Sequence, residues 1–302
     1  MTLGRVTVLT NPASGHGGAT HAAERAIAQF HRLGVDVVAV AGTDADHARR
    51  LVEGALERGM DALVVVGGDG IVSLALQVLA QNDIPLGIIP AGTGNDHARE
   101  FGIPTKRPEA AADVVVDGVA ETVDLGRITG ADGTVRWFGT VMAAGFDSLV
   151  TDRTNRMTWP HGRMRYNLAM VAEISKLRLL PFRLTLDGEE LVTDLTLAAF
   201  GNTRSYGGGM LICPDADPTD GLLDVTMLAS ASRTRLIRLF PTVFKGTHVE
   251  LDEVRTARAK VITVECVASP GITAYADGEF VCSLPVEVSA VPGALRILRP
   301  AP

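Results

Sequence analysis

Three short loops rich in glycine and small polar residues each follow an apolar run in the first hundred residues. They occupy residues 11–15, 67–70 and 92–96. Glycine lets backbone N–H groups come close to a phosphate where a strand is followed by a helix. Asp69 and Asp96 add carboxylates of the kind that hold Mg²⁺ together with phosphate oxygens. The loops predict a phosphate site, with magnesium bridging a nucleoside triphosphate as the economical ligand.

A tight turn between a strand and a helix is the alternative interpretation of any one such loop, because glycine serves both purposes. The chain has no G-x-x-x-x-G-K-[ST] motif, and no G-x-G-x-x-G motif follows its first apolar run. An ordinary P-loop and an ordinary dinucleotide-binding fold are therefore disfavoured.

The segments that must position these loops alternate between strand-like and helix-like patterns. Strands are predicted over 6–9, 35–41, 62–66 and 85–89, and helices over 19–33, 45–58 and 71–79. This alternation is typical of βαβ units and a mostly parallel sheet. Residues 62–66 are apolar on both faces, as in a central strand covered by helices. The carboxyl ends of such strands meet at one edge of the sheet, which would bring the three loops together.

From about Val123 the pattern changes to short strands in which apolar and polar residues alternate, most clearly over 182–186 and 262–266. We therefore predict an α/β protein with two domains. Residues 1–124 would form a mostly parallel, three-layer α/β nucleotide-binding domain, and residues 125–290 an antiparallel, β-sandwich-like domain. Whether residues 291–302 pack back on the first domain is left open.

The composition is that of a globular protein, with 302 residues, 46% of them hydrophobic, and a formal net charge of −7. The acidic balance disfavours nucleic acid as a partner bound through a broadly basic surface. Three cysteines without a C-x-x-C pair disfavour disulfides and a zinc site, so a cytoplasmic location is expected. We expect no secretory signal and no membrane-spanning segment.

Motifs in both halves of the chain resemble one family. They lie at residues 11–15, 67–70, 90–96, 206–210, 214–224 and 277–279. In this order and spacing they are similar to the diacylglycerol kinase catalytic domain family, which bacterial lipid kinases and sphingosine kinases share. The resemblance covers essentially the whole chain and is nearest to the soluble diacylglycerol kinases of actinobacteria. It implies transfer of the γ-phosphoryl group of ATP to a lipid hydroxyl, foremost that of diacylglycerol, giving phosphatidic acid for phospholipid synthesis.

The resemblance also implies which residues bind ATP. They are Asn11, Pro12, Ala13, Ser14, Gly15, Thr43, Gly67, Gly68, Asp69, Gly70, Ile71, Val72, Ser73, Thr93, Gly94 and Asn95. Where the family often has Thr-Val-Asn-Glu after the second loop, this chain has Ile-Val-Ser-Leu at 71–74. The change removes a hydroxyl, an amide and a carboxylate, and leaves backbone groups as the phosphate contacts of this segment.

Catalytic and metal-binding roles are implied in the same way. Glu279 would be the general base that takes the proton of the acceptor hydroxyl, with Asp277 beside it. The catalytic Mg²⁺ and its water would be organised by Asp69, Asp96 and Asp124. A second, structural Mg²⁺ would use the Asp220 carboxylate with the backbone carbonyls of Asp217 and Leu222.

Two of these assignments have simpler alternatives in the sequence itself. Asp-Gly pairs also occur at residues 117–118, 132–133 and 187–188, and such pairs commonly form hairpin turns. Carboxylates in a proline-containing loop such as 214–224 are often solvated turns. The seven histidines have no paired metal-ligand spacing and are interpreted as surface or local hydrogen-bonding groups, with His97 singled out because it adjoins Asp96.

Two segments mix arginine with large apolar side chains, as an anionic membrane surface would require. Residues 153–165 carry four arginines with Met157, Trp159 and Met164, and residues 232–246 carry an apolar stripe at helical spacing. The alternative is that each stripe packs on the protein's own sheet. We expect a lipid acceptor and a transient peripheral association with the inner face of the cell membrane. Whether the protein forms a homodimer is left open.

Other functions stay open at this point. A sphingoid base or another lipid could be the acceptor, and NAD kinases share the Gly-Gly-Asp-Gly turn. A protein that binds nucleotide or lipid without catalysis could use the same fold. Such a protein would be expected to lack the base or a metal carboxylate, whereas Asp69, Asp96 and Glu279 are all present.

Overall fold

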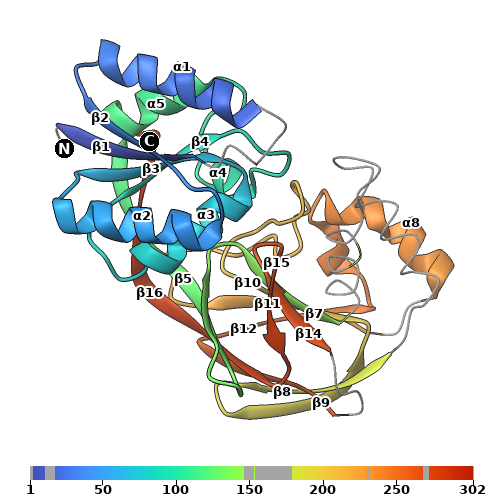
Figure 1. The fold of residues 1–302 in the computed structure, drawn as a ribbon. Coiled ribbons are helices and arrows are strands. Elements are labelled where there is room, and N and C mark those ends of the chain that lie inside the picture. The colour runs from blue at the N-terminus through green and yellow to red at the C-terminus, as the bar shows by residue number, and fades with distance from the viewer. Residues whose placement is uncertain are drawn as a thin grey trace. The chain divides into compact units, whose positions relative to one another are not determined.

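The computed structural model describes residues 3–10, 18–145, 153, 179–229, 232–267 and 272–301. The chain divides into two compact units, which are described one at a time. The first comprises Met1–Leu125 with Pro292–Pro302, and the second comprises Gly126–Val291 (Figure 1).

The first unit is built on a parallel sheet in the order β2-β1-β3-β4. Its strands are β1 (Arg5–Thr10), β2 (Asp36–Ala41), β3 (Ala62–Gly67) and β4 (Leu86–Pro90). Every residue of β3 is buried, as expected of a strand covered on both faces. The predicted alternation of strands and helices is confirmed.

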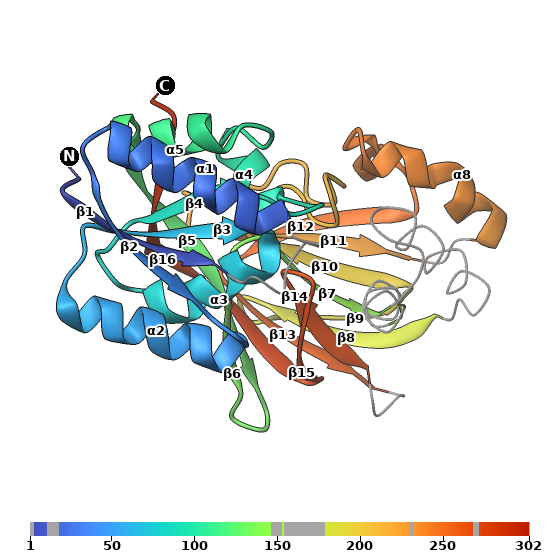
Figure 2. The same ribbon diagram turned by 45° about the horizontal axis from the view of Figure 1, so that its top comes forward.

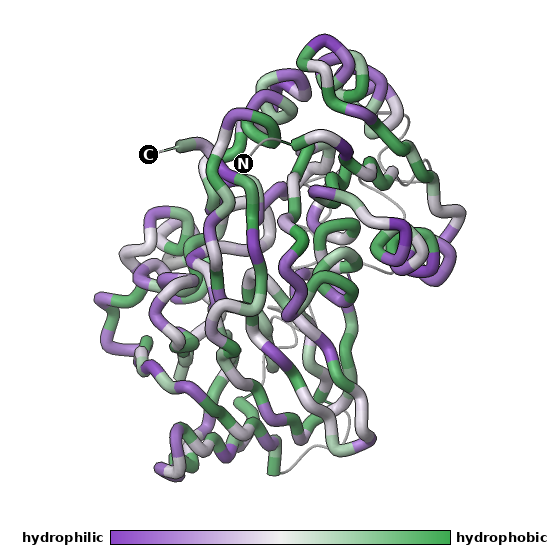
Figure 3. Tube along the Cα trace, turned by 90° about the vertical axis from the view of Figure 1, so that its left-hand side faces the viewer, coloured by the Kyte–Doolittle hydropathy of each residue, from purple (hydrophilic) through white to green (hydrophobic). Residues whose placement is uncertain are grey.

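Helices cover both faces of this sheet (Figure 2). Those on one face are α1 (Gly18–Arg32) and α5 (Pro108–Asp117), and those on the other are α2 (Ala45–Arg58) and α3 (Asp69–Leu79). The short α4 (Asp96–Glu100) follows β4. The sequence sets these boundaries: the Asp44 carboxylate caps α2 by accepting the His47 N–H at 2.8 Å, and Gly59 ends the helix with φ of 80°. Hydrophilic and hydrophobic residues interleave along the helices (Figure 3).

The last residues of the chain complete the first unit. Ile297 of β16 (Val286–Arg299) pairs in parallel with Leu86 of β4. The Ala294 carbonyl accepts a 2.7 Å hydrogen bond from the Gln81 N–H, and Arg299 pairs with Glu121 at 2.7 Å. The first unit is therefore discontinuous in sequence, and β5 (Val119–Gly130) and β16 both contribute residues to each unit.

The second unit is a sandwich of antiparallel strands, which confirms the predicted fold class. One sheet has the order β12-β11-β10-β7-β14-β15. Its strands are β7 (Val141–Gly145), β10 (Leu197–Gly201), β11 (Leu223–Leu228), β12 (Val254–Ala259), β14 (Thr273–Ala276) and β15 (Glu279–Ser283). Facing it are the paired strands β6 (Val135–Phe138), β8 (Leu180–Leu186), β9 (Glu189–Leu195) and β13 (Val261–Cys266), with the second-unit parts of β5 and β16.

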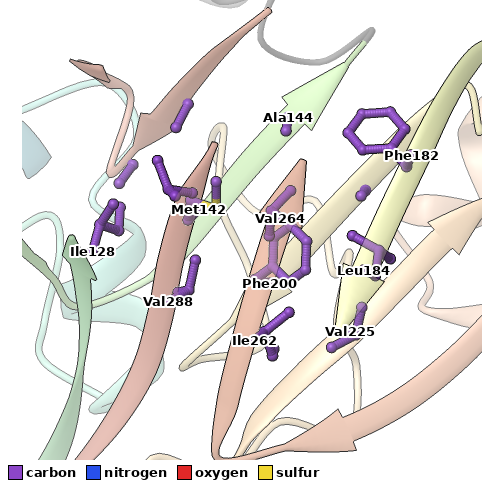
Figure 4. Close-up of a cluster of buried hydrophobic side chains, with 14 of the residues drawn as sticks. Ile128, Met142, Ala144, Phe182, Leu184, Phe200, Val225, Ile262, Val264 and Val288 are labelled. Carbon is purple, nitrogen blue, oxygen red and sulfur yellow. The ribbon is translucent and has the colours of Figure 1, made fainter. Parts of the chain in front are cut away.

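Side chains from both sheets meet in one apolar core (Figure 4). Phe182 and Leu184 of β8 and Ile262 of β13 face Met142 and Phe200 of the other sheet, and all five are fully buried. The predicted period-two alternation over 182–186 and 262–266 thus places the apolar residues inside. A helix, α8 (Arg233–Val243), and a short 3₁₀ helix (Thr247–Glu250) also belong to the unit. No helix in the described part of the chain is long and apolar enough to cross a membrane.

Candidate functional site

The loops after β3 and β4 are packed backbone against backbone. A Cβ atom added to Gly92 would lie 2.4 Å from the Gly68 Cα, and the Ala91 N–H donates a 2.8 Å hydrogen bond to the Gly67 carbonyl. Any side chain at either glycine would push the loops apart. The structure thus gives these glycines a role in loop contact besides the phosphate approach that the sequence suggested.

Asn95 fixes the conformation of the second of these loops. Its backbone is left-handed, with φ of 55°, a conformation that asparagine tolerates better than most residues. Its Oδ1 accepts the Gly92 N–H at 2.9 Å and its Nδ2 donates to the Gly92 carbonyl at 2.8 Å. Asn95 is 8% exposed. The side chain of this residue, which was predicted to bind nucleotide, therefore stabilises the conformation of its own loop.

Asp69 and Asp96 converge beside Gly94, as the sequence predicts for loops at one sheet edge. A Cβ atom added to Gly94 would lie 2.5 Å from Asp69 Oδ2 and 3.4 Å from Asp96 Oδ2. Asp96 is 4% exposed, and its Oδ1 accepts a 3.2 Å hydrogen bond from Arg99. Carboxylate oxygens brought together at a position without a side chain fit a small hard cation such as Mg²⁺.

His97 holds the Asp69 carboxylate from the other side. Both the backbone N–H of His97 and its Nδ1 contact Asp69 Oδ1, at 3.2 and 3.1 Å. Burial by itself raises the pKa of Asp69, but the hydrogen bonds and charge of His97 outweigh it and leave that pKa below its usual value. Asp69 is therefore ionised at neutral pH, with Oδ2 as the oxygen nearest Gly94.

The remaining residues predicted to bind nucleotide differ in the exposure of their side chains. Thr93 lies at an exposed loop position, and Gly70 is exposed in the first turn of α3. Thr43 is exposed just before the cap of α2, and its hydroxyl contacts Asp44 and His47. The side chains of α3 behave otherwise: Ile71, Val72 and Ser73 are 8, 2 and 1% exposed. That segment can therefore offer a ligand little besides backbone groups. Residues 11–15 lie outside the described residues.

Asp124 lies in the part of β5 that belongs to the first unit and is 3% exposed. Its Oδ1 accepts a 2.8 Å hydrogen bond from the N–H of Gly293 in β16. Asp124 was predicted to help organise magnesium, and one of its carboxylate oxygens links β5 to β16.

In the second unit, Asp277 is the first residue of a tight turn between β14 and β15. Both turn residues are left-handed, with φ of 50° at Asp277 and 80° at Gly278. The Asp277 carboxylate is 7% exposed and accepts three hydrogen bonds. They come from the Gly139 N–H at 3.0 Å, the Thr140 N–H at 2.8 Å and the Thr140 hydroxyl at 2.6 Å. Asp277 therefore binds the turn to the segment between β6 and β7.

A second Asp-Gly turn has the same backbone conformation, but its aspartate is exposed. Asp187 and Gly188, between β8 and β9, have φ of 49° and 94°. The Asp187 carboxylate accepts the N–H groups of Lys260 and Val261 at 2.9–3.1 Å, but it does so at the protein surface. In both turns the next residue is glutamate: Glu189 in one and Glu279 in the other.

Glu279 differs from its counterpart in its electrostatic surroundings. Its residue surface is exposed, yet atoms packed around the carboxyl partly desolvate it. This desolvation raises the pKa of Glu279, the positive charge of Arg136 opposes the rise, and the nearby Asp277 charge adds to it. A carboxylate whose pKa lies above its usual value is a better proton acceptor than an ordinary surface glutamate.

Carboxylates of the acidic loop before β11 have hydrogen-bond partners within the protein. Asp217 Oδ1 accepts the N–H and hydroxyl of Thr219, and Asp220 Oδ1 accepts the Leu222 N–H at 2.9 Å. The Arg258 guanidinium then pairs with Asp220 Oδ2 and, at 3.1 Å, with Asp224. The described residues contain no group of three or more acidic, histidine or cysteine side chains arranged to hold a metal ion, either in this loop or beside Gly94. Arg258 takes up one Asp220 oxygen, but burial and the charges of Asp215 and Asp217 still raise the pKa of Asp224 to about 6. The structural magnesium ion at this loop stays a prediction.

The glycine run at 207–209 forms a loop closed by a bridge between Tyr206 and Met210. All three glycines are left-handed, with φ of 61°, 88° and 100°. Successive residues in this conformation need glycine, which explains the run. The arginine-containing segment around Met157 lies outside the described residues, apart from Arg153.

The chain thus joins an α/β unit, whose loops gather glycines and two aspartates at one sheet edge, to a β-sandwich unit. Residues 5–128 match the diacylglycerol kinase catalytic domain, and residues 140–299 match the YegS C-terminal NAD kinase beta sandwich-like domain. The chain belongs to the diacylglycerol kinase family of lipid kinases, which confirms the resemblance seen in the sequence.

Relatives match over nearly the full length. The diacylglycerol kinase of Mycobacterium tuberculosis is 68% identical over 299 residues, which cover 99% of this chain and 96% of the relative. The probable lipid kinase YegS-like of Stenotrophomonas maltophilia is 32% identical and covers 91% of each chain. A crystal structure of a diacylglycerol kinase from Bacillus anthracis has a TM-score of 0.74 at 19% identity, covering 99% of this chain and 98% of that one. Another structure from that organism has a TM-score of 0.79 at 22% identity, with the same coverage, so the fold is shared.

Proposed function

We propose that this protein transfers the γ-phosphoryl group of MgATP to the hydroxyl of diacylglycerol, giving phosphatidic acid. The observation that carries the proposal is the convergence of Asp69 and Asp96 beside Gly94 in loops of the matched catalytic domain. The 68% identity to a protein named diacylglycerol kinase supports the choice of acceptor. We assign the protein to the cytoplasm and to the inner face of the membrane, where such an acceptor is found.

Phosphoryl transfer leaves little covalent work to the protein, so the residues act by alignment and charge. The loops after β3 and β4 would hold the phosphates through backbone N–H groups of their glycine-rich segments. Asp69 and Asp96 would hold Mg²⁺, which neutralises charge developing on the transferred group. His97 keeps Asp69 ionised and oriented for that task.

Glu279 is assigned as the general base that accepts the proton of the lipid hydroxyl. Its raised pKa suits a base working near neutral pH. Asp277 is assigned a positioning role, because its carboxylate already accepts three hydrogen bonds that fix the turn preceding Glu279.

The test is transfer of labelled phosphate from MgATP to diacylglycerol, monoacylglycerol, ceramide and sphingosine in mixed micelles, and to NAD in buffer. Glu279→Gln is compared with Glu189→Gln, which makes the same change after the matched Asp-Gly turn. We expect diacylglycerol to be phosphorylated, Glu279→Gln to lose at least a hundredfold in kcat, and Glu189→Gln to match the wild type.

Each other result revises a specific part of the proposal. Transfer to sphingosine or ceramide in place of diacylglycerol would reject the acceptor and keep the mechanism. Transfer to NAD alone would reject a lipid substrate. Full activity of Glu279→Gln would reject the base, and no transfer to any acceptor would favour a binding protein.

A further inference from the structure

The helix α8 is fastened to the second unit, yet within the described part of the chain it has exposed apolar side chains. Ser232 caps its start by accepting the Arg235 N–H at 3.3 Å. Arg235 makes two hydrogen bonds to Glu253, at 2.7 and 3.3 Å. At the other end the Val243 carbonyl accepts the Leu211 N–H at 3.0 Å, and the Val243 side chain packs on a buried cluster around Ile212. The orientation of the helix within its unit is therefore fixed.

The outward side carries large apolar side chains in consecutive turns. Ile237 is 56% exposed and Phe244, one residue past the end of the helix, is 41% exposed. Phe240 lies between them at helical spacing and stacks edge-to-face on Phe244, with 5.4 Å between ring centroids. Single exposed apolar residues are ordinary, but a row spanning two helical turns indicates a surface that contacts something apolar.

Cationic side chains flank this row. Arg238 follows Ile237 and Lys245 follows Phe244, and both are exposed. Residues 232–246 contain four basic residues and no aspartate or glutamate, in a chain whose net charge is −7. Apolar side chains with adjacent cations and no acidic residue are the pattern of helices that lie in the interface of an anionic bilayer.

We propose that α8 with Phe244 and Lys245 docks this protein on anionic membranes, with Ile237 and Phe244 entering the interface and Arg238 and Lys245 contacting lipid headgroups. The sequence left open whether this stripe packs on the protein's own sheet; Val243 does so, whereas Ile237 and Phe244 are exposed in the described structure. The inference gives the proposed lipid kinase a means of reaching its acceptor and rests on that proposal, but its test does not need catalysis.

The test is sedimentation with vesicles of phosphatidylcholine containing 30% phosphatidylglycerol, without nucleotide. Wild type is compared with Ile237→Ser/Phe244→Ser and Arg238→Glu/Lys245→Glu. The matched controls are Val192→Ser, an apolar residue 58% exposed on β9, and Arg50→Glu/Lys106→Glu, exposed cations of the first unit. We expect both α8 variants to bind at least tenfold more weakly, which is about 1.4 kcal/mol, and both controls to bind like the wild type.

Thermal melting verifies that every variant is folded, which surface substitutions should permit. Transfer to a water-soluble short-chain diacylglycerol should be unchanged in the α8 variants. Unchanged vesicle binding of Ile237→Ser/Phe244→Ser would overturn docking through α8, as would wild-type protein that does not bind the vesicles. If equal losses occurred in the controls, general charge or solubility would explain the binding. Vesicle binding without phosphorylation of any diacylglycerol would leave docking in place and reject the proposed acceptor.

Discussion

Replacing Asp277 with asparagine separates a positioning role from a chemical one. The carboxylate receives two backbone N–H groups and one hydroxyl while 7% exposed. An amide keeps one acceptor oxygen and turns an NH₂ group toward the other donors. Leaving one buried donor unsatisfied costs about 1–3 kcal/mol, and the remaining hydrogen bonds lose the benefit of a charged acceptor. We expect Asp277→Asn to lower the free energy of unfolding by about 3 kcal/mol, or roughly 10 °C in Tm.

The assay is thermal unfolding of Asp277→Asn beside Asp187→Asn, followed by phosphate transfer at 20 °C. Asp187 occupies the same kind of turn, but its hydrogen bonds lie at the surface, where water can replace them. Its variant should lose less than about 1 kcal/mol. Folded Asp277→Asn should retain transfer well above the level of Glu279→Gln. The reasoning is refuted if Asp277→Asn melts like the wild type and yet loses transfer as completely as Glu279→Gln.

Three further predictions concern the loops and the base. Gly92→Ala places a Cβ atom against the facing loop, so we expect MgATP to bind at least tenfold more weakly by calorimetry, at a cost of about 1–3 kcal/mol. Arg136→Gln removes a charge that lowers the pKa of Glu279; that pKa should rise, and because the base works deprotonated, the acidic limb of the kcat/KM profile should move to higher pH. His97→Phe should raise the Mg²⁺ concentration needed for half-maximal transfer, whereas His97→Asn, whose amide NH₂ can replace Nδ1 beside Asp69, should recover most of the loss. Unaltered Mg²⁺ dependence of His97→Phe would contradict that role.

The strands β1 to β4 and the helices α1 to α3 could be predicted because their signals are local. The unbroken apolar run of β3 and the capped start of α2 depend on residues within one or two turns of each other. The meeting of Asp69 and Asp96 was also predictable, since parallel strands bring their carboxyl ends to one edge. Their partners were not all predictable. The contact between His97 and Asp69 joins residues 28 positions apart, and no local pattern encodes it.

The Asp-Gly pairs show where sequence reasoning ends. Their turn-forming tendency is visible in the dipeptide, and both Asp187 and Asp277 adopt it. What distinguishes them is the segment that each carboxylate meets, and for Asp277 that segment is 137 residues away. The same limit applies to Asp220: its loop is typical of a cation site, and its pairing with Arg258 joins residues 38 positions apart.

The discontinuity of the first unit has a consequence for the order in which the protein can mature. Synthesis delivers the loops after β3 and β4 early, while the residues that pair with β4 and satisfy the Gln81 N–H follow only after the whole second unit. Until residues 292–299 have left the ribosome, β4 is an edge strand with unpaired backbone groups. A chain released early would carry every loop predicted to bind nucleotide on an unfinished sheet. Assembly of the first unit therefore has to wait until the second unit has been synthesised.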